Sequence, residues 1–392
     1  MKICILTPRF PFPENGGDVL RINAIARYLK EKGSQLCLCS YTEGKVTDEN
    51  LIKAKYLYDN IYYIKRNKLV SLFYSFISLL SGKPVQCGYY YSIRYKKLFS
   101  KVCLVEKPDL YISHLLRMTP YLVNEQCRKK TIIEMTDALS KTYTLSSNIR
   151  GFSPKKWIYK IEKRRMEKYE QKVIAEYPKV VLVSKSDKVL LGNQKNIYVH
   201  TNGVNCISQL NDNYNPDKIT FVGNMRTLQN QDAVLFFAKE IFPLIKEKKP
   251  DAFFEIIGAQ PSEQIKELHD GKNIIVTGYV DSVEDELKDS CVAVAPVRIA
   301  AGIQNKVLVA MACGVPVVLT SLISQAIPEL SDGINCFVQD SKEKIAEKII
   351  DLMTDNNLRK QVARKGFEIV KENYSWNSKL DGYEILVQEQ KN

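Results

Sequence analysis

The sequence predicts an α/β protein with two domains, each built on a parallel β-sheet. The length of 392 residues exceeds what one hydrophobic core usually organises and suits two domains. Short apolar runs of strand type alternate with segments of helical periodicity, which is typical of parallel α/β folds. The contents of 45% hydrophobic and 26% charged residues are those of a soluble globular protein.

The chain opens with a strand, a glycine loop, a helix and a second strand. Lys2–Thr7 is the first strand, Gly16 and Gly17 precede a helical pattern of apolar residues, and Leu36–Ser40 is the next strand. This order is the start of a Rossmann-like domain. The glycine pair is not the three-glycine dinucleotide fingerprint, so it indicates either a turn or the wall of a phosphate site.

Polar residues follow two predicted strands in the first half. Asp109–Ser113 reads as a buried strand that leads into His114 and then Arg117, and the next strand carries Glu134 and Asp137 near its end. Parallel α/β folds place ligand contacts at the carboxyl ends of strands. We interpret His114 as a catalytic or acceptor-orienting residue, with a core histidine as the alternative. The other three are candidate acceptor contacts.

The excess of positive over negative charge lies entirely in the first half of the chain. The net charge is +19 over residues 1–203 and −6 over residues 204–392. Such a surface suits an anionic membrane or nucleic acid. We favour the membrane because Leu69–Leu80 is apolar and aromatic between flanking lysines. It is too short to span a bilayer but could lie in the interface with Phe73, Tyr74 and Phe76 inserted; an ordinary buried helix is the alternative.

A basic helical stretch, Lys155–Lys172, also belongs to this half. Such a run is usually a solvated helix face. Alternatively, Lys163, Arg164 and Arg165 meet lipid head groups or a pyrophosphate-linked acceptor. Ten cysteines without a CxxC pair or a signal-peptide pattern indicate reduced thiols and a cytoplasmic protein.

A strand, a loop and a helix near residue 300 suit an anion. The strand ends at Ala295, the loop runs from Arg298 to Gln304, and the helix begins at about Asn305. Gly302 allows close approach to the backbone, and the free amides at the helix start attract negative charge. Because Arg298 and Lys306 flank the loop, we expect them to bind a diphosphate and to be catalytic.

The motifs AGIQNKVLVAMACGVPVV and PELSDGINCFV resemble the donor-site signature of family-4 glycosyltransferases. The resemblance implies the GT-B architecture, in which two Rossmann-like domains face each other across a cleft. It also implies sugar transfer with retention of configuration, in bacterial surface polysaccharide biosynthesis. The family has glutamates at the positions of Ala301 and Val309. In the family, the glutamate at the position of Val309 holds the hydroxyl groups of the nucleotide ribose.

The same resemblance implies the domain boundaries. The tripeptide Asn202-Gly203-Val204 marks the exit from the first domain. We therefore predict an acceptor- and membrane-facing domain at 1–204, a linker at 205–217 and a nucleotide-sugar domain at 218–372. Residues 373–392 are expected to cross back onto the first domain.

Further site residues follow from positions that match the family. Arg21 is a candidate acceptor contact. The candidate donor contacts lie on the loops after the predicted strands: Gly16, Gly17, Gly223, Asn224, Arg226, Tyr279, Val280, Gly302, Ile303, Gln304 and Asn305.

The sequence thus predicts a glycosyltransferase that is peripheral on the inner face of the cell membrane. The expected partners are a UDP- or GDP-linked sugar, a glycan or polyprenyl-diphosphate-linked acceptor and an anionic membrane, without nucleic acid. Asp-x-Asp is absent from the sequence and only three histidines occur, so we expect no divalent metal and no other cofactor. A non-catalytic partner subunit and a sugar-nucleotide epimerase are the alternatives.

Overall fold

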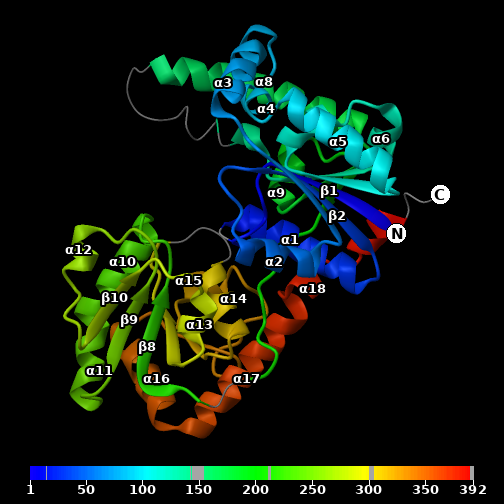
Figure 1. Ribbon diagram of the computed structural model, residues 1–392. Coiled ribbons are helices and arrows are strands. Elements are labelled where there is room, and N and C mark those ends of the chain that lie inside the picture. The colour runs from blue at the N-terminus through cyan, green and yellow to red at the C-terminus, as the bar shows by residue number, and fades with distance from the viewer. Residues whose placement is uncertain (15, 142, 144–153, 211–212, 300–303, 389–392) are drawn as a thin grey trace. The chain divides into compact units, whose positions relative to one another are not determined.

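The computed structural model describes residues 1–392 except 15, 142, 144–153, 211–212, 300–303 and 389–392, and only the backbone of 154–158. It consists of two compact units (Figure 1). The N-terminal unit is Met1–Asn202 with Lys379–Asn392, and the C-terminal unit is Gly203–Ser378. The predicted fold class is confirmed, because the described strands form two parallel sheets.

The sheet of the N-terminal unit has the order β3-β2-β1-β4-β5-β6-β7. Figure 1 shows α1 and α2 below the strands and α5, α6 and α8 above them. The strands are β1 (Lys2–Thr7), β2 (Gln35–Thr42), β3 (Asn60–Lys65), β4 (Leu110–His114), β5 (Thr131–Thr136), β6 (Lys179–Leu182) and β7 (Ile197–Val199). The helices are α1 (Gly17–Glu31), α2 (Asp48–Leu57), α3 (Lys68–Leu80), α4 (Val85–Tyr89), α5 (Ile93–Glu106), η1 (Leu116–Tyr121), α6 (Glu125–Lys129), α8 (Pro154–Glu176), α9 (Lys185–Leu190) and α19 (Tyr383–Gln388).

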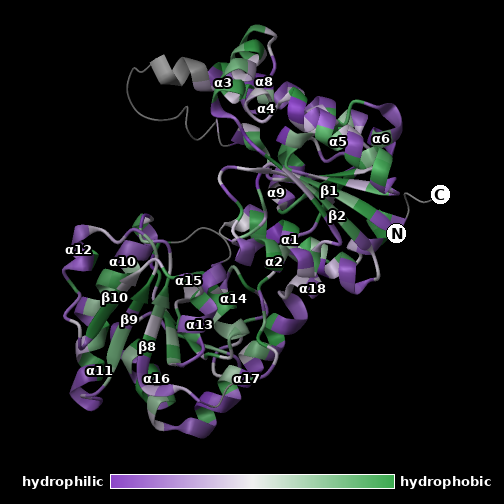
Figure 2. Ribbon diagram, in the orientation of Figure 1, coloured by the Kyte–Doolittle hydropathy of each residue, from purple (hydrophilic) through white to green (hydrophobic). Residues whose placement is uncertain are grey.

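Strand register brings the predicted acceptor residues of this unit to one edge. Thr7 of β1 pairs with Ser40 of β2, and His114 of β4 pairs with Glu134 of β5. Because the pairings are parallel, the loops that follow β1, β4 and β5 all leave the carboxyl edge of the sheet. The strands that reach this edge are the hydrophobic centre of the unit, as Figure 2 shows by their green colour.

Helix α3 has its apolar residues outside and its serines inside. Its buried residues are Ser71 and Ser78. The exposed fraction is at least 40% for its large apolar residues Leu69, Leu72, Phe73, Phe76, Ile77, Leu79 and Leu80. The alternative of an ordinary buried helix is therefore wrong. Among the helices that the structure describes, none is long and apolar enough to cross a membrane.

Small residues explain how α3 is held. A Cβ atom on Gly88 of α4 would lie 2.3 Å from the Ser78 hydroxyl and from the Tyr74 carbonyl oxygen. The backbones of α3 and α4 therefore approach closely through Gly88 and Ser78, and the bulky side chains of α3 are left on the opposite side. Helix α8 fixes the pair, since Arg165 donates to the Leu79 carbonyl oxygen at 2.9 Å.

The sheet of the C-terminal unit has the order β10-β9-β8-β11-β12-β13. Its strands are β8 (Asn215–Val222), β9 (Phe253–Ile257), β10 (Ile274–Gly278), β11 (Ser290–Ala295), β12 (Val317–Leu319) and β13 (Phe337–Val338). Its helices are α10 (Leu228–Phe236), η2 (Phe237–Ile241), α11 (Phe242–Lys248), α12 (Glu263–Lys266), α13 (Val283–Leu287), α14 (Asn305–Ala312), α15 (Ser321–Ser324), α16 (Lys342–Thr354) and α17 (Asn356–Asn373), and α18 (Trp376–Lys379) spans the boundary.

The linker prediction of 205–217 is wrong at its end. Strand β8 begins at Asn215, and Asn215 pairs with Ser290 of β11. The polar composition of this segment resembles a linker, but pairing of Asn215 with the parallel strand β11 makes it the start of a strand; the pairing with β9 begins only at Lys218.

Candidate functional site

A polar cluster lies in the C-terminal unit where β8 and β11 end. The two strands are parallel neighbours, with Thr220 beside Ala293. Their following loops therefore leave the same edge of the sheet and lead into α10 and α14. Lys306 is the second residue of α14, as the sequence predicts, and Gln304 is the buried residue before the helix.

Lys306 is a partly buried cation without a carboxylate partner in the described part of the chain. Its ammonium group donates to the Asn230 side-chain oxygen and lies 4.7 Å from the centre of the Phe221 ring. Burial lowers the pKa of Lys306 to about 8, because desolvation disfavours the charged form. A buried ammonium group at the start of a helix is a strong attractor for an anion.

The position of Asn230 depends on Gly223. A Cβ atom on Gly223 would lie 2.6 Å from the Asn230 amide nitrogen, so a side chain there would displace it. Asn230 also donates to the Asn224 carbonyl oxygen at 2.9 Å. Gly223, Asn224 and Lys306 are therefore brought together, although Asn230, which joins them, was not predicted. Its position inside a predicted helix gave no signal.

Arg298 is placed differently from Lys306. Its guanidinium forms two hydrogen bonds with Asp232 of α10, at 3.0 and 2.6 Å, and lies 4.3 Å from the centre of the Phe236 ring. Its charge is balanced by that carboxylate, which the sequence analysis did not anticipate. Arg298 can reach a diphosphate only by leaving or sharing Asp232, so Lys306 is the stronger candidate.

Most of the other predicted donor residues are exposed or lie outside the described residues. Asn224 caps the amide of Arg226 through its side chain, and the Arg226 side chain is exposed. Asn305, the first residue of α14, is exposed, while Gly302 and Ile303 lie outside the described residues. At the end of β10, Tyr279 is 61% exposed beside the partly buried Val280.

A second polar cluster lies at the carboxyl edge of the N-terminal sheet. His114 is fully buried, and neither of its ring nitrogens has a hydrogen-bond partner among the described residues. Burial lowers its pKa to about 3, and the nearby Arg21 and Arg117 act in the same direction while Asp18 opposes them. His114 is therefore a neutral imidazole with one donor and one acceptor available.

Arg21 and Glu134 form a buried ion pair rather than a free acceptor site. Arg21 Nε donates to Glu134 at 2.8 Å, both side chains are fully buried, and Tyr383 of α19 donates to the other carboxylate oxygen at 2.9 Å. Arg21 also donates to Asn202 at 3.1 Å. The expectation that Glu134 contacts an acceptor is contrary to this placement, because both of its oxygens are occupied.

The same network holds the end of the chain on the N-terminal unit. In addition to the Tyr383 contact, Lys179 of β6 donates to the Leu386 carbonyl oxygen at 2.7 Å. Tyr28 of α1 donates to Glu384. Helix α19 is thus part of the N-terminal unit although it follows the C-terminal one in sequence.

The remaining predicted residues of this edge are within reach of solvent. Gly16, with φ of 114°, precedes α1 beside Arg9, which pairs with Asp18, and Gly17 is the first residue of α1. Arg117 lies over the Tyr90 ring at 4.8 Å. Asp137 is exposed at the surface. Desolvation by the surrounding protein, followed by the nearby Asp187 carboxylate, raises the pKa of Asp137. Arg9 was not predicted, although a basic residue just after β1 is a recognisable signal.

Comparison with known proteins points to one enzyme class. Residues 216–355 match the family described as Glycosyl transferases group 1. The matched segment lies within the C-terminal unit. A Klebsiella pneumoniae protein, described as an uncharacterized 44.6 kDa protein in the cps region, is 22% identical over 95% of this chain and 96% of its own. An uncharacterized glycosyltransferase of Methanocaldococcus jannaschii is 27% identical over 44% of this chain and 45% of its own.

Solved structures show the same fold. HepE from Anabaena in complex with UDP has a TM-score of 0.57 at 13% identity, with 99% of this chain and 100% of HepE covered. A TarM variant from S. aureus has a TM-score of 0.61 at 13% identity over the same shares. These neighbours are GT-B glycosyltransferases, so the two Rossmann-like units form the predicted GT-B fold.

Substitution of Glu134 tests the buried pair. Glu134→Gln removes the charge that balances Arg21, and we expect the free energy of unfolding to fall by about 3–5 kcal/mol, because an uncompensated charge is left buried. Chemical denaturation measures this. Asp137→Asn, the same change at an exposed position, should alter stability by less than about 0.5 kcal/mol. Equal effects of the two substitutions would contradict the assignment.

Lys306→Met should stabilise the protein at pH 7. Desolvation lowers the pKa of Lys306 to about 8 in the native protein, from the ordinary 10.5. The charged lysine therefore lowers the free energy of unfolding at any pH below 8. This penalty amounts to about 3 kcal/mol and disappears as pH rises from 8 to 10.5. We expect the variant to gain stability at pH 7 and to lose that advantage by pH 10.5. A variant that is less stable at pH 7 would show that Lys306 is already compensated.

Proposed function

We propose that the protein transfers a sugar, with retention of configuration and without a divalent metal, from a UDP- or GDP-linked donor to a glycan or lipid-linked acceptor. The observation that carries the proposal is the partly buried Lys306 at the start of α14, which has no carboxylate partner among the described residues. A bound diphosphate would be the negatively charged partner that this ammonium group lacks among the described residues. Its binding would raise the pKa of Lys306.

Lys306 would act on the leaving group. When the bond between the anomeric carbon and the diphosphate oxygen breaks, the electron pair goes to that oxygen and negative charge grows there. Lys306 and the first amides of α14, which have no partner within the helix, stabilise this charge. His114 is neutral and both of its ring nitrogens lack a partner among the described residues, so it would hydrogen-bond a sugar hydroxyl as an uncharged imidazole.

Several relatives support the substrate classes. HepE has been solved with UDP-glucose, and TarM with UDP and α-GlcNAc-glycerol. WaaG, described as a glycosyltransferase of lipopolysaccharide biosynthesis, has a TM-score of 0.53 at 12% identity over 98% of this chain and 99% of its own. With the relative from the cps region, these proteins support a role in bacterial surface polysaccharide biosynthesis.

Lys306→Ala tests the donor role. One charge-assisted contact to a developing anion contributes about 2–4 kcal/mol, so we expect turnover of the preferred nucleotide sugar to fall at least about tenfold. A calorimetric screen of nucleotide sugars first identifies that donor. Lys342→Ala, which removes an exposed lysine paired with Glu240, is the matched control and should leave turnover unchanged. Unchanged turnover in Lys306→Ala, or no donor binding by the native protein, would contradict the proposal.

We also propose that the N-terminal unit docks on the inner face of the cell membrane through α3. The exposed residues Leu72, Phe73 and Phe76 would insert at the level of the head groups, and the net charge of +19 over residues 1–203 would attract anionic lipid. No other described helix of this unit carries as continuous an exposed apolar surface.

Flotation with phosphatidylglycerol vesicles tests the docking. Replacing Leu72, Phe73 and Phe76 together by Ser should reduce the bound fraction at least about tenfold, because each buried apolar side chain contributes about 1.5–3 kcal/mol. The same change at Ile52 and Tyr56 of α2, which are 56% and 81% exposed, is the control and should have little effect. Flotation that depends equally on α2 and α3, or on neither, would overturn the proposal.

A further inference from the structure

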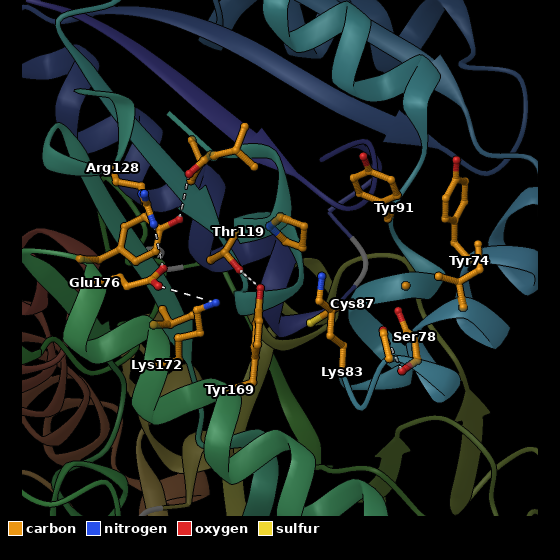
Figure 3. A pocket seen from close by; sticks show the side chains of 18 residues that line it. Tyr74, Ser78, Lys83, Cys87, Tyr91, Thr119, Arg128, Tyr169, Lys172 and Glu176 are labelled. Carbon is orange, nitrogen blue, oxygen red and sulfur yellow. Dashed lines mark hydrogen bonds and ion pairs between the residues drawn. The ribbon is translucent and has the colours of Figure 1, made fainter. Parts of the chain in front are cut away.

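A cavity of about 430 Å³ lies in the N-terminal unit between the α3–α4 pair, η1 and α8. Figure 3 shows Lys83, Cys87, Ser78 and Tyr74 on one side and Arg128, Lys172 and Glu176 on the other, with Tyr169 between them. Its volume is within the range of small-molecule sites. None of the sugar- or nucleotide-binding residues predicted above lines it.

The cavity has aromatic and apolar side chains on part of its wall. The Tyr169 hydroxyl is satisfied by the Thr119 hydroxyl at 2.8 Å, and Tyr177 donates to the Leu122 carbonyl oxygen at 3.4 Å. Burial raises the pKa of the Cys87 thiol to about 12, so it is neutral. The rings of Tyr169 and Tyr177 therefore offer their carbon surfaces to a ligand, while their hydroxyl groups are engaged by the wall.

The entrance of the cavity is positive at one place. Arg128 and Lys172 both contact Glu176, at 3.0 and 3.7 Å, so their charges are partly balanced. Lys83, in the turn between α3 and α4, is exposed and makes no ion pair with any described residue. An anionic group at the entrance would therefore be bound at Lys83.

The cavity and the apolar surface of α3 share one residue. Ile77 lines the cavity and is also 40% exposed, on the same helix as the exposed Phe73 and Phe76. A hydrocarbon chain from a bilayer at α3 would therefore have an apolar contact at the cavity. Burial of apolar surface would drive entry of the chain, because water leaves both the chain and the rings.

We propose that this cavity binds the hydrocarbon chain of a phosphate-headed lipid, with the phosphate at Lys83 and the chain between α3–α4 and α8. The inference deepens the proposed function, on which it rests, by giving a lipid-linked acceptor a chain-binding site in the N-terminal unit. Isoprenyl phosphates and the phospholipids of the bilayer both combine a phosphate group with a hydrocarbon chain. The two kinds of lipid differ in the shape of that chain.

Calorimetry on the full chain, with farnesyl monophosphate below its micelle-forming concentration, tests the site. We expect saturable one-to-one binding, weaker binding of farnesol, and no saturable binding of inorganic phosphate. Dodecyl phosphate distinguishes the sources: preference for the farnesyl compound assigns the site to an isoprenyl acceptor, and equal affinity assigns it to lipid chains in general. Absence of saturable binding of both amphiphiles would overturn the inference.

Two pairs of variants locate the binding. Val123→Trp fills the cavity from a rim position that is 59% exposed, and it should weaken farnesyl phosphate binding at least tenfold; Ile52→Trp is the matched change outside the cavity and should have no effect. Lys83→Glu should weaken binding several-fold, whereas Lys101→Glu, on exposed α5 surface, should not. Thermal melting of each variant verifies that it is folded.

The outcomes separate this inference from the proposed function. If Val123→Trp binds farnesyl phosphate as tightly as the native protein, the cavity is not the site, and the inference fails even when sugar transfer is normal. If the native protein neither binds nor turns over a nucleotide sugar, the proposed function fails, whatever the lipid measurements show.

Discussion

The candidate site of the C-terminal unit is organised around one charge that no described carboxylate balances. Lys306 is held in a partly buried position by Asn230 and the Phe221 ring, and neither of them can neutralise an ammonium group. Gly223 leaves the space that Asn230 occupies, so the first loop of this unit is shaped to keep the lysine in place. A protein that retains such a charge at a cost in stability gains a group that is ready for an anion.

The cation at the sheet edge of the N-terminal unit, in contrast, has a carboxylate partner. Arg21 is as deeply buried as any described residue, but Glu134 balances its charge, and Tyr383 and Asn202 make further hydrogen bonds to the pair. The pair joins α1, β5 and the last helix of the chain, so its role is to fix the edge on which the neutral His114 stands. Breaking it would disturb several elements at once, which is why stability rather than affinity is the property that reports on it.

Local sequence patterns were sufficient for the fold and for part of the candidate site. Lys306 was predicted from the strand, loop and helix pattern around it, whereas Gly223 and Asn224 were predicted from positions that match the family; all three follow apolar strands and lie at a sheet edge. Asn230, Asp232 and Tyr383 could not be found in this way, because they lie inside helices and their contacts are set by packing. The strand β3, NIYYIK, was also missed, since it is only half buried and carries polar residues. Helix α3 shows the converse: its composition is that of a core helix, and only the close contact of Gly88 with Ser78 decides that its apolar side faces outward.

Val309 bears on how this chain differs from the enzymes it resembles. In the family a glutamate at this position on α14 holds the nucleotide ribose, and that carboxylate also lies on the same short helix as the lysine. With valine there, the ribose loses a hydrogen-bond acceptor, and Lys306 loses a nearby negative charge that would compete with the diphosphate. Under the proposed function, the two effects act on different parts of the donor, and we expect recognition to depend less on the nucleoside and more on the diphosphate, where most of the charge in the transition state would develop. Loss of the ribose contact would then weaken ground-state binding more than stabilisation of the leaving group, which is the part of the interaction that accelerates a reaction.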